Sequence, residues 1–267
     1  MQGFMYSMRQ MMRQSTRRLN MNIKYVSCSY KRAKTCTTQE LYPYVDYVVA
    51  ESEAKEYTDA GKKVIAVPDE HGANGTSRVR NYVLNNILPK HDCVIFMDDD
   101  YDAFYRWQNQ TKVLMGQKEL EEFCEQMSLL CKEWGYWMWG VNCVGDKGAY
   151  REHTPFSTQN YISSTFNAHL NGTRQRYDDK LPLKEDYDMT LQHIVFKGGC
   201  LRANFCHYDV KQAEQAGGCA TYRNLEKERS QFEAFQKKWG KDIVQRDYKS
   251  RRSFDFNPII KSPRRGV

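Results

Sequence analysis

The stretch Cys93-Val94-Ile95-Phe96-Met97-Asp98-Asp99-Asp100 joins five apolar residues directly to three aspartates. A short continuous apolar run is typical of a strand that is buried on both faces, as in a parallel α/β sheet. Ligands of such sheets bind in the crevice at the carboxyl ends of the strands, which is where these carboxylates follow. The stretch therefore predicts a parallel sheet with an acidic ligand site at one edge. The alternative is a strand that ends in a solvated acidic turn.

The chain ahead of this stretch alternates between short apolar runs and helical patterns. We expect strands at residues 23–27, 47–50 and 64–67, and helices at residues 52–60 and 76–88. Three strand–helix–strand crossovers within about 80 residues favour a parallel, Rossmann-like sheet. No G-x-G-x-x-G follows the first strand, which disfavours a dinucleotide cofactor.

The chain after the aspartates continues the mixture of strands and helices. Expected strands lie at residues 104–107, 136–144, 161–170 and 201–208, and expected helices at 117–134 and 225–239. Residues 183–193 are expected to be a loop that enters a helix, which Gly198 and Gly199 end. No long linker interrupts them, so we predict a single α/β domain with a mainly parallel central sheet and flanking helices. The predicted divisions are a basic N-terminal extension at 1–21, the domain at 22–245 and a basic C-terminal tail at 246–267.

The charge of the chain is unevenly distributed along its length. The 267 residues carry a net charge of +7, and no acidic residue precedes Glu40, although Lys and Arg are frequent there. The last residues, from Arg246 onward, are again mostly basic. Basic ends favour a polyanionic partner such as DNA or RNA, and the alternative is ordinary solubilising charge.

The cysteines and the apolar runs indicate in which cellular compartment we expect the protein. The nine cysteines show neither C-x-x-C nor a zinc-binding spacing, which is typical of reduced thiols in a cytoplasm. No apolar run is long enough for a transmembrane helix, and the N-terminus lacks the apolar part of a secretory signal. We therefore expect no membrane partner and a cytoplasmic protein, in a host cell if the chain is phage-encoded.

The three aspartates have the chemistry of a divalent metal site. Asp98 and Asp100 alternate along the chain, so both can reach one Mn²⁺ or Mg²⁺ ion through oxygen ligands. Such an ion would neutralise a departing diphosphate. Asp99 points the opposite way on a strand and is expected to meet sugar hydroxyls or a buried partner, unless a turn exchanges these roles. The pattern resembles the DxD motif of nucleotide-sugar-dependent glycosyltransferases of the GT-A fold.

Two segments before the aspartates are candidates for binding the nucleotide sugar. Ser27, Tyr30 and Arg32 lie at the end of the first strand, where a ring can stack on a base and an arginine can bind phosphate. The alternative is a plain surface loop. The other segment runs from Asp69 through a glycine-containing loop to a helix that opens at Thr76, whose N-terminus favours phosphate.

That helix carries Arg78, Arg80 and Asn81, in an order that resembles the Arg–Asn helix preceding the DxD strand in GT-A enzymes. Arg78 and Asn81 are three residues apart and share a helix face, so we prefer Arg78 to Arg80 as the ligand, although either fits. The alternative is the solvated basic start of a helix.

Two later features complete the resemblance to GT-A enzymes. Glu185 and Asp186 open a helix and resemble the ED-type motif of inverting enzymes, which implies that Asp186, or else Glu185, is the catalytic base. The alternative is that these acids only favour the helix dipole. A late histidine is often a third metal ligand in these enzymes, which makes His207 a candidate against a plain structural histidine.

The layout of residues 22–245 resembles a more specific family, the glycosyltransferases associated with TET/JBP oxygenases, which includes the base J glucosyltransferase and phage enzymes. The segments that carry this resemblance are Ile23–Arg32, Val64–Asn81, Cys93–Arg106, Leu183–His193 and Gly217–Glu226. Membership implies a hexosyltransferase that moves a sugar, glucose being expected, from a UDP-sugar to the hydroxyl of a 5-hydroxymethylpyrimidine in DNA.

Tyr222 and Arg223 lie in a glycine-containing loop that could stack on a flipped base and hold the DNA backbone. The alternative is a plain loop before a helix, with Asn224 as the N-cap. The alternatives to a DNA-modifying enzyme are a GT-A enzyme with a glycan or protein acceptor, a metal-dependent nucleic-acid enzyme and a non-enzymatic DNA-binding protein. The sugar and the choice between hydroxymethyluracil and hydroxymethylcytosine stay open.

Overall fold

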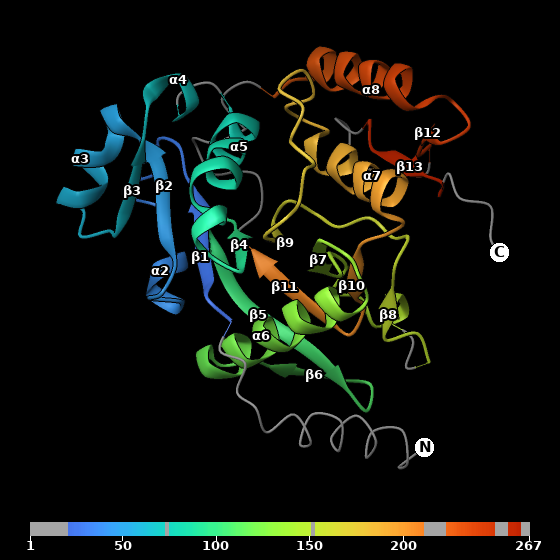
Figure 1. The fold of residues 1–267 in the computed structure, drawn as a ribbon, viewed down its shortest axis with the longest axis horizontal. Coiled ribbons are helices and arrows are strands. Elements are labelled where there is room, and N and C mark those ends of the chain that lie inside the picture. The colour runs from blue at the N-terminus through green and yellow to red at the C-terminus, as the bar shows by residue number, and fades with distance from the viewer. Residues whose placement is uncertain (1–20, 73–74, 151–152, 211–222, 249–255, 263–267) are drawn as a thin grey trace.

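An eight-stranded sheet forms the centre of the computed structural model, which describes residues 21–72, 75–150, 153–210, 223–248 and 256–262 (Figure 1). The strand order is β3-β2-β1-β4-β9-β7-β10-β8. Its strands are β1 (Ile23–Cys28), β2 (Asp46–Ala50), β3 (Val64–Val67), β4 (Cys93–Met97), β7 (Met138–Val141), β8 (Phe156–Ser157), β9 (Phe166–Leu170) and β10 (Leu201–Ala203). Only β9 and β8 run against the common direction, so the predicted mainly parallel sheet is confirmed.

Strand β4 lies inside this sheet, and every one of its side chains is buried. Cys93, Ile95 and Met97 pack into one hydrophobic core, whereas Val94 and Phe96 pack into a second core. Successive side chains of a strand point to opposite faces, so only an apolar residue at every position can serve both cores. The continuous apolar run is therefore what fixes β4 between two layers of helices.

The helices cover both faces of the sheet. Helix α6 contributes Leu120, Phe123 and Met127 to the first core, and α5 and α7 contribute Val83 and Met189 to the second. Helix α8 packs beside α7 (Figure 1). The helices are α2 (Thr38–Leu41), α3 (Glu51–Asp59), α4 (Asp69–Gly72), α5 (Thr76–Asn86), α6 (Gln117–Glu133), α7 (Glu185–Lys197) and α8 (Leu225–Trp239), with short 3₁₀ turns η1 (Leu88–Lys90) and η2 (Lys147–Ala149).

A smaller antiparallel sheet, β11-β5-β6, begins directly after Asp100. It consists of β5 (Tyr101–Gln108), β6 (Thr111–Leu114) and β11 (Cys206–Val210). The single strand expected at residues 201–208 is wrong, because the chain turns between β10 and β11 and joins both sheets in succession. Asn204 stabilises this turn by donating to the carbonyl of Thr154 at 2.8 Å and accepting from Arg202 at 2.8 Å.

The C-terminal part of the chain also contributes to the fold. Strand β12 (Val244–Arg246) pairs with β13 (Pro258–Ile260), and Val244 and Ile260 pack with α7 and α8. Part of the predicted tail at 246–267 is therefore a structural element. Most of the predicted extension at 1–21, and Gly217 to Tyr222 of the predicted acceptor loop, lie outside the described residues. In the described ranges, no helix has the length and apolar character needed to cross a membrane.

The buried histidine His193 gives the stability of the fold a predictable pH dependence. Burial lowers the pKa of His193 to about 3, so its ring stays neutral in the folded protein. The unfolded state binds this proton near pH 6.5, so the stabilising contribution is lost as the pH falls below that value. Between pH 7.5 and 5, the free energy of unfolding of the wild type should fall by about 2 kcal/mol relative to His193→Gln.

Urea unfolding at a series of pH values measures this difference. The exposed His153 provides the matched control, because His153→Gln should leave the pH profile of the wild type unchanged. Parallel profiles for the wild type and His193→Gln would contradict the assignment of a neutral buried ring.

Candidate active site

The three aspartates are fixed by backbone hydrogen bonds at the carboxyl end of β4. The amide of Asp98 donates to the carbonyl of Thr165 at 3.0 Å, just ahead of β9. The carbonyl of Asp98 accepts from the hydroxyl of Thr38 at 2.7 Å, at the start of α2. The aspartates thus lie where elements far apart in the sequence meet.

Asp99 points to the loop after β1 and is almost completely buried. Its Oδ1 accepts from Nη1 of Arg32 at 2.7 Å, and its Oδ2 accepts from the hydroxyl of Ser29 at 2.5 Å. Ser29 also contacts the hydroxyl of Tyr57, whose oxygen accepts from the amide of Arg32 at 3.0 Å. Asp99 therefore anchors this loop through a buried ion pair.

Asp98 and Asp100 remain only partly compensated by positive charge. The carboxylate of Asp100 is 3.6 Å from Arg32, and burial together with the charges of Asp98 and Asp99 raises its pKa to about 7. Burial also raises the pKa of Asp98, against the opposing charge of Arg80. An excess of negative charge thus faces the sheet edge, which is the condition that a bound cation relieves.

Arg80 connects this acidic edge to the start of α7. Its guanidinium is 3.9 Å from Asp98 through Nη2 and 3.9 Å from Glu185 through Nη1, and Nη2 donates to the carbonyl of Ser164 at 3.0 Å. The guanidinium also lies over the rings of Phe96 and Tyr177, at 5.7 and 5.4 Å from their centroids. With its residue only 3% exposed, Arg80 is a buried cation shared between two acidic motifs.

The other predicted residues of this region lie elsewhere. Arg78 is half-exposed and pairs with Asp179 at 3.1 Å, and Asp69 accepts from the backbone amide of Ser52 at 3.0 Å. Asn81 uses its side-chain amide on the backbone of Tyr177, donating and accepting at 2.8 Å. The structure therefore brings Arg80, rather than Arg78, to the aspartates, and gives Asn81 and Asp69 roles in holding the backbone.

The helical pattern contains the signal that would have favoured Arg80. Arg80 precedes the buried Val83 and Leu84 by three and four residues, which places it on the face of α5 that packs against the sheet. Arg78 is two residues away and so lies roughly 200° around the helix, toward solvent.

Glu185 and Asp186 form the first turn of α7 beside this cation. Burial, with the neighbouring charge of Asp186, raises the pKa of Glu185 above its usual value, while the charge of Arg80 opposes this shift. Asp186 accepts from the hydroxyl of Tyr161 through Oδ2 and from the amide of Tyr187 through Oδ1 at 2.8 Å. The amide of Ser164 lies 3.5 Å from the same Oδ2, so the residue that binds Arg80 also contacts Asp186. The two acidic motifs are thus neighbours in space.

His207 does not lie with the aspartates, so its predicted role as a third metal ligand is not supported by its position. Its ring is completely buried and stacks on Tyr105 and Trp107, at centroid distances of 5.4 and 5.7 Å. Val210 pairs with Tyr101, the residue after Asp100, so His207 sits about 10 Å further along β11. The chain order suggested proximity, but the antiparallel register separates them.

The remaining candidates lie in varied surroundings. Ser27 is completely buried within β1, and Tyr30 is half-buried in the following loop with Lys31 over its ring. Arg223 pairs with Glu228, at the end of α8 nearest the predicted acceptor loop, and Tyr222 lies outside the described residues.

The donor set suits a divalent cation that is shared with a substrate. Asp98 and Asp100 offer carboxylate oxygens, which are the ligands that Mg²⁺ and Mn²⁺ prefer. Within the described ranges, no three His, Cys, Asp or Glu side chains are grouped so that they could hold a metal ion by themselves. Mg²⁺ is commonly held by one or two carboxylates plus substrate phosphates, so these residues fit an ion that binds together with a diphosphate.

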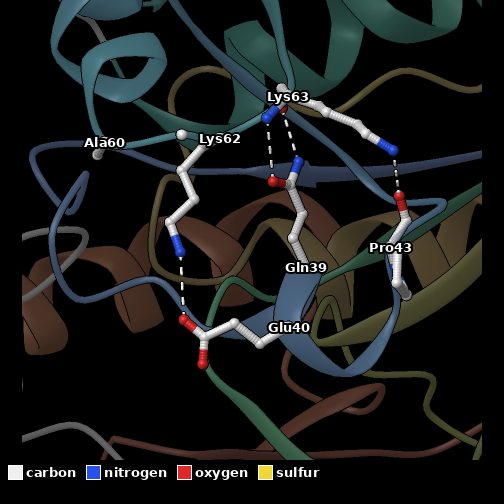
Figure 2. A pocket seen from close by; sticks show the side chains of 7 residues that line it. Gln39, Glu40, Pro43, Ala60, Lys62 and Lys63 are labelled. Atoms are coloured by element: carbon white, nitrogen blue, oxygen red, sulfur yellow. Dashed lines mark hydrogen bonds and ion pairs between the residues drawn. The ribbon is translucent and has the colours of Figure 1, made fainter.

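Two hollows open on the surface of the described structure. One of about 210 Å³ lies between α2 and the chain before β3, and Figure 2 shows that its polar groups bind one another. Lys62 pairs with Glu40, Lys63 donates to the carbonyl of Pro43, and Gln39 binds the backbone of Lys63. The other hollow, of about 320 Å³, borders Asp186 through Tyr161 and Tyr187.

Similarity to known proteins is found among solved structures. No protein-family model and no curated protein matches the sequence. The chain is similar to S. aureus TarS, with a TM-score of 0.43 and 14% identity over 81% of this chain and 40% of TarS. It is also similar to S. aureus TarS 1–349 in complex with UDP, with a TM-score of 0.45 and 13% identity over 81% of this chain and 66% of that one. The chain therefore spans less than two thirds of either protein.

The buried position of Arg80 leads to a prediction about stability. Arg80→Gln removes the only cation that lies within 4 Å of both Asp98 and Glu185 in the described ranges, and so leaves two carboxylates poorly compensated. Breaking a buried ion pair by removing one partner costs about 3–5 kcal/mol, so we expect a loss of that size in the free energy of unfolding. Urea denaturation at pH 7.5 measures it.

Arg78→Gln is the matched control, because it removes the same charge from the same helix at a half-exposed position. Its effect should stay within about 0.5 kcal/mol. Equal losses for the two variants would show that Arg80 is no more important than an ordinary surface arginine.

Proposed function

We propose that this protein is a metal-dependent, inverting GT-A glycosyltransferase that moves a sugar, glucose being the first to test, from a UDP-sugar to the hydroxyl of a 5-hydroxymethylpyrimidine in DNA. The observation that carries the proposal is the position of Arg80 between Asp98 at the end of β4 and Glu185 at the start of α7. These contacts join the candidate diphosphate site to the start of α7, which carries the candidate base Asp186. The sequence resemblance to TET/JBP-associated glycosyltransferases supplies the acceptor.

The carboxylate of Asp186 is suited to the role of general base. The base accepts the proton of the acceptor hydroxyl while that oxygen attacks the anomeric carbon of the sugar. The Tyr161 hydroxyl and the Tyr187 amide donate to the Asp186 carboxylate and hold its orientation. A single displacement from the face opposite the leaving group would invert the configuration, giving a β-linkage from an α-linked donor.

The acidic residues on the other side of Arg80 would serve the leaving group. Asp98 and Asp100 would hold Mn²⁺ or Mg²⁺ together with the diphosphate, and the ion would supply charge neutralisation for the departing UDP. Arg32 keeps Asp99 and Asp100 in place through its contacts at 2.7 and 3.6 Å. Glu185 is the buried partner of Arg80, so we assign it to positioning rather than to proton transfer.

The distribution of charge supports DNA as the acceptor. The net charge of +7 arises largely from acid-poor segments at the two ends of the sequence. Lys and Arg side chains that neutralise DNA phosphates release counterions, which supplies sequence-independent affinity. A glycan acceptor would not require this excess of positive charge.

The function is tested by transfer from UDP-sugars to DNA that contains hydroxymethyluracil or hydroxymethylcytosine. Asp186→Asn should reduce transfer by about 10²–10⁴-fold, because it removes general-base catalysis, while the affinity for UDP stays unchanged. Mass spectrometry of the nucleosides measures transfer, and calorimetry measures UDP binding. Asp242→Asn, at an exposed position, is the control. Normal turnover of Asp186→Asn would refute its role as the base, and no transfer from any donor by the wild type would refute the proposed function.

The metal requirement gives a separate prediction. Transfer should stop in EDTA and return when Mn²⁺ or Mg²⁺ is added in excess. Asp98→Asn and Asp100→Asn should each raise the Mn²⁺ concentration for half-maximal activity at least about tenfold, because each removes an anionic oxygen ligand. Full activity in EDTA would contradict a metal at this site.

A further inference from the structure

The hollow beside Asp186 has the size and lining of a small binding site. Its volume of about 320 Å³ falls at the lower end of the range for ligand pockets. It lies between the segment after β8, the start of α7, strand β10 and strand β13. The residues that line it are Gln159, Asn160, Tyr161, Tyr187, Arg202, Pro258 and Ile260.

Arg202 is the only charged residue in this lining, and its charge is not balanced by an acid. Its Nε donates to the side-chain oxygen of Asn204 at 2.8 Å, and its Nη1 donates to the carbonyl of Tyr161 at 3.1 Å. Both acceptors are neutral, and no carboxylate of the described residues pairs with Arg202. Burial accordingly lowers the pKa of Arg202. By contrast, the other arginines near the site, Arg32 and Arg80, each contact two carboxylates.

The geometry of Arg202 suits an incoming anion. Two of its three nitrogens are held by neutral acceptors, so the plane of the guanidinium is fixed while its Nη2 has no partner among the described residues. A fixed guanidinium fork matches the oxygens of a phosphate, and a charge-assisted hydrogen bond of this kind is about twice as strong as a neutral one. Binding a phosphate would also compensate the buried charge.

The hollow is connected to the proposed base through two of its lining residues. Two of its lining residues, Tyr161 and Tyr187, donate hydrogen bonds to the carboxylate of Asp186. Asp98 approaches the same region through Arg80 and Ser164 instead. A ligand in this hollow would therefore lie next to the proposed base, which is where the acceptor hydroxyl has to reach.

The strand that forms the outer wall adds further positive charge. Lys261 follows the lining residue Ile260, and Arg246 lies opposite Pro258 in the register of β12 and β13. Arg246 packs over the ring of Phe256, with its guanidinium carbon 4.1 Å from the ring centroid. These two basic residues are thus sequence or strand neighbours of residues that line the hollow.

We propose that this hollow is the acceptor subsite, and that Arg202 binds a backbone phosphate of the DNA next to the nucleotide that is modified. This inference rests on the proposed function, because it takes Asp186 as the base and DNA as the acceptor. In this proposal the catalytic domain itself binds the acceptor DNA, through Arg202, which belongs to none of the sequence motifs.

The test compares Arg202→Gln with the wild type by fluorescence anisotropy on hydroxymethylated duplex DNA at several salt concentrations. Loss of one phosphate contact should weaken binding and reduce the slope of log affinity against log salt by about 1. The KM for DNA should rise at least about tenfold, and kcat and the affinity for UDP should stay unchanged.

Two further variants separate this effect from general loss of charge or of folding. Arg229→Gln removes an exposed arginine that pairs with Glu233 on α8, so it should leave the salt slope of the wild type unchanged. Arg202→Lys keeps the charge without the planar fork and should restore the slope with lower affinity. Unchanged UDP binding by Arg202→Gln shows that the variant is folded.

The outcomes distinguish the subsite from the proposed function. If the wild type modifies DNA and Arg202→Gln binds DNA with the wild-type slope, or loses no more than Arg229→Gln, the subsite is wrong while the function stands. Loss of UDP affinity in a folded Arg202→Gln, as shown by an unchanged thermal midpoint, would assign the arginine to the donor and overturn the proposal. If binding depends on Arg202 but no sugar is transferred, the phosphate site stands and the function fails. Absence of DNA binding by the wild type would overturn both.

Discussion

The candidate site depends on one buried cation, the guanidinium of Arg80, which lies 3.9 Å from both Asp98 and Glu185. Carboxylates at such a site repel one another in a medium of low effective dielectric constant, where charges interact more strongly than in water. The cation reduces this repulsion, and the neighbouring rings of Phe96 and Tyr177 keep water away from it. Arg80 therefore lowers the electrostatic cost of bringing the strand-end acids close to the helix-start acids.

The surrounding fold fixes this cation from several sides. Asn81 holds the backbone of Tyr177 with two hydrogen bonds at 2.8 Å, and Tyr177 in turn packs over Arg80. Ser164 contacts Arg80 through its carbonyl and Asp186 through its amide. A residue predicted to bind substrate, Asn81, thus acts in the structure on the residue behind the site.

The sequence predicted the sheet and the position of the acids well, because both depend on local patterns. Every position of β4 carries an apolar residue, and the apolar residues of α6 and α8 recur at helical spacing. Both patterns can be recognised from the sequence alone. The partners of His207 and Arg202 depend on strand register and on a turn at Asn204, where one apolar pattern continues through both strands. Those long-range contacts have no local signal. The sequence therefore predicted the order of the site residues along the chain but not their positions in space.

Arg80 also precedes both of its acidic partners along the chain. The strand that carries Asp98 and the helix that carries Glu185 both follow Arg80 at a distance in the sequence, and a domain generally folds as a unit. The cation and its acidic partners therefore come together in the same cooperative step that forms the contacts of Ser164 with Arg80 and Asp186. A weakened contact at Arg80 is consequently felt by the whole domain rather than by one local turn.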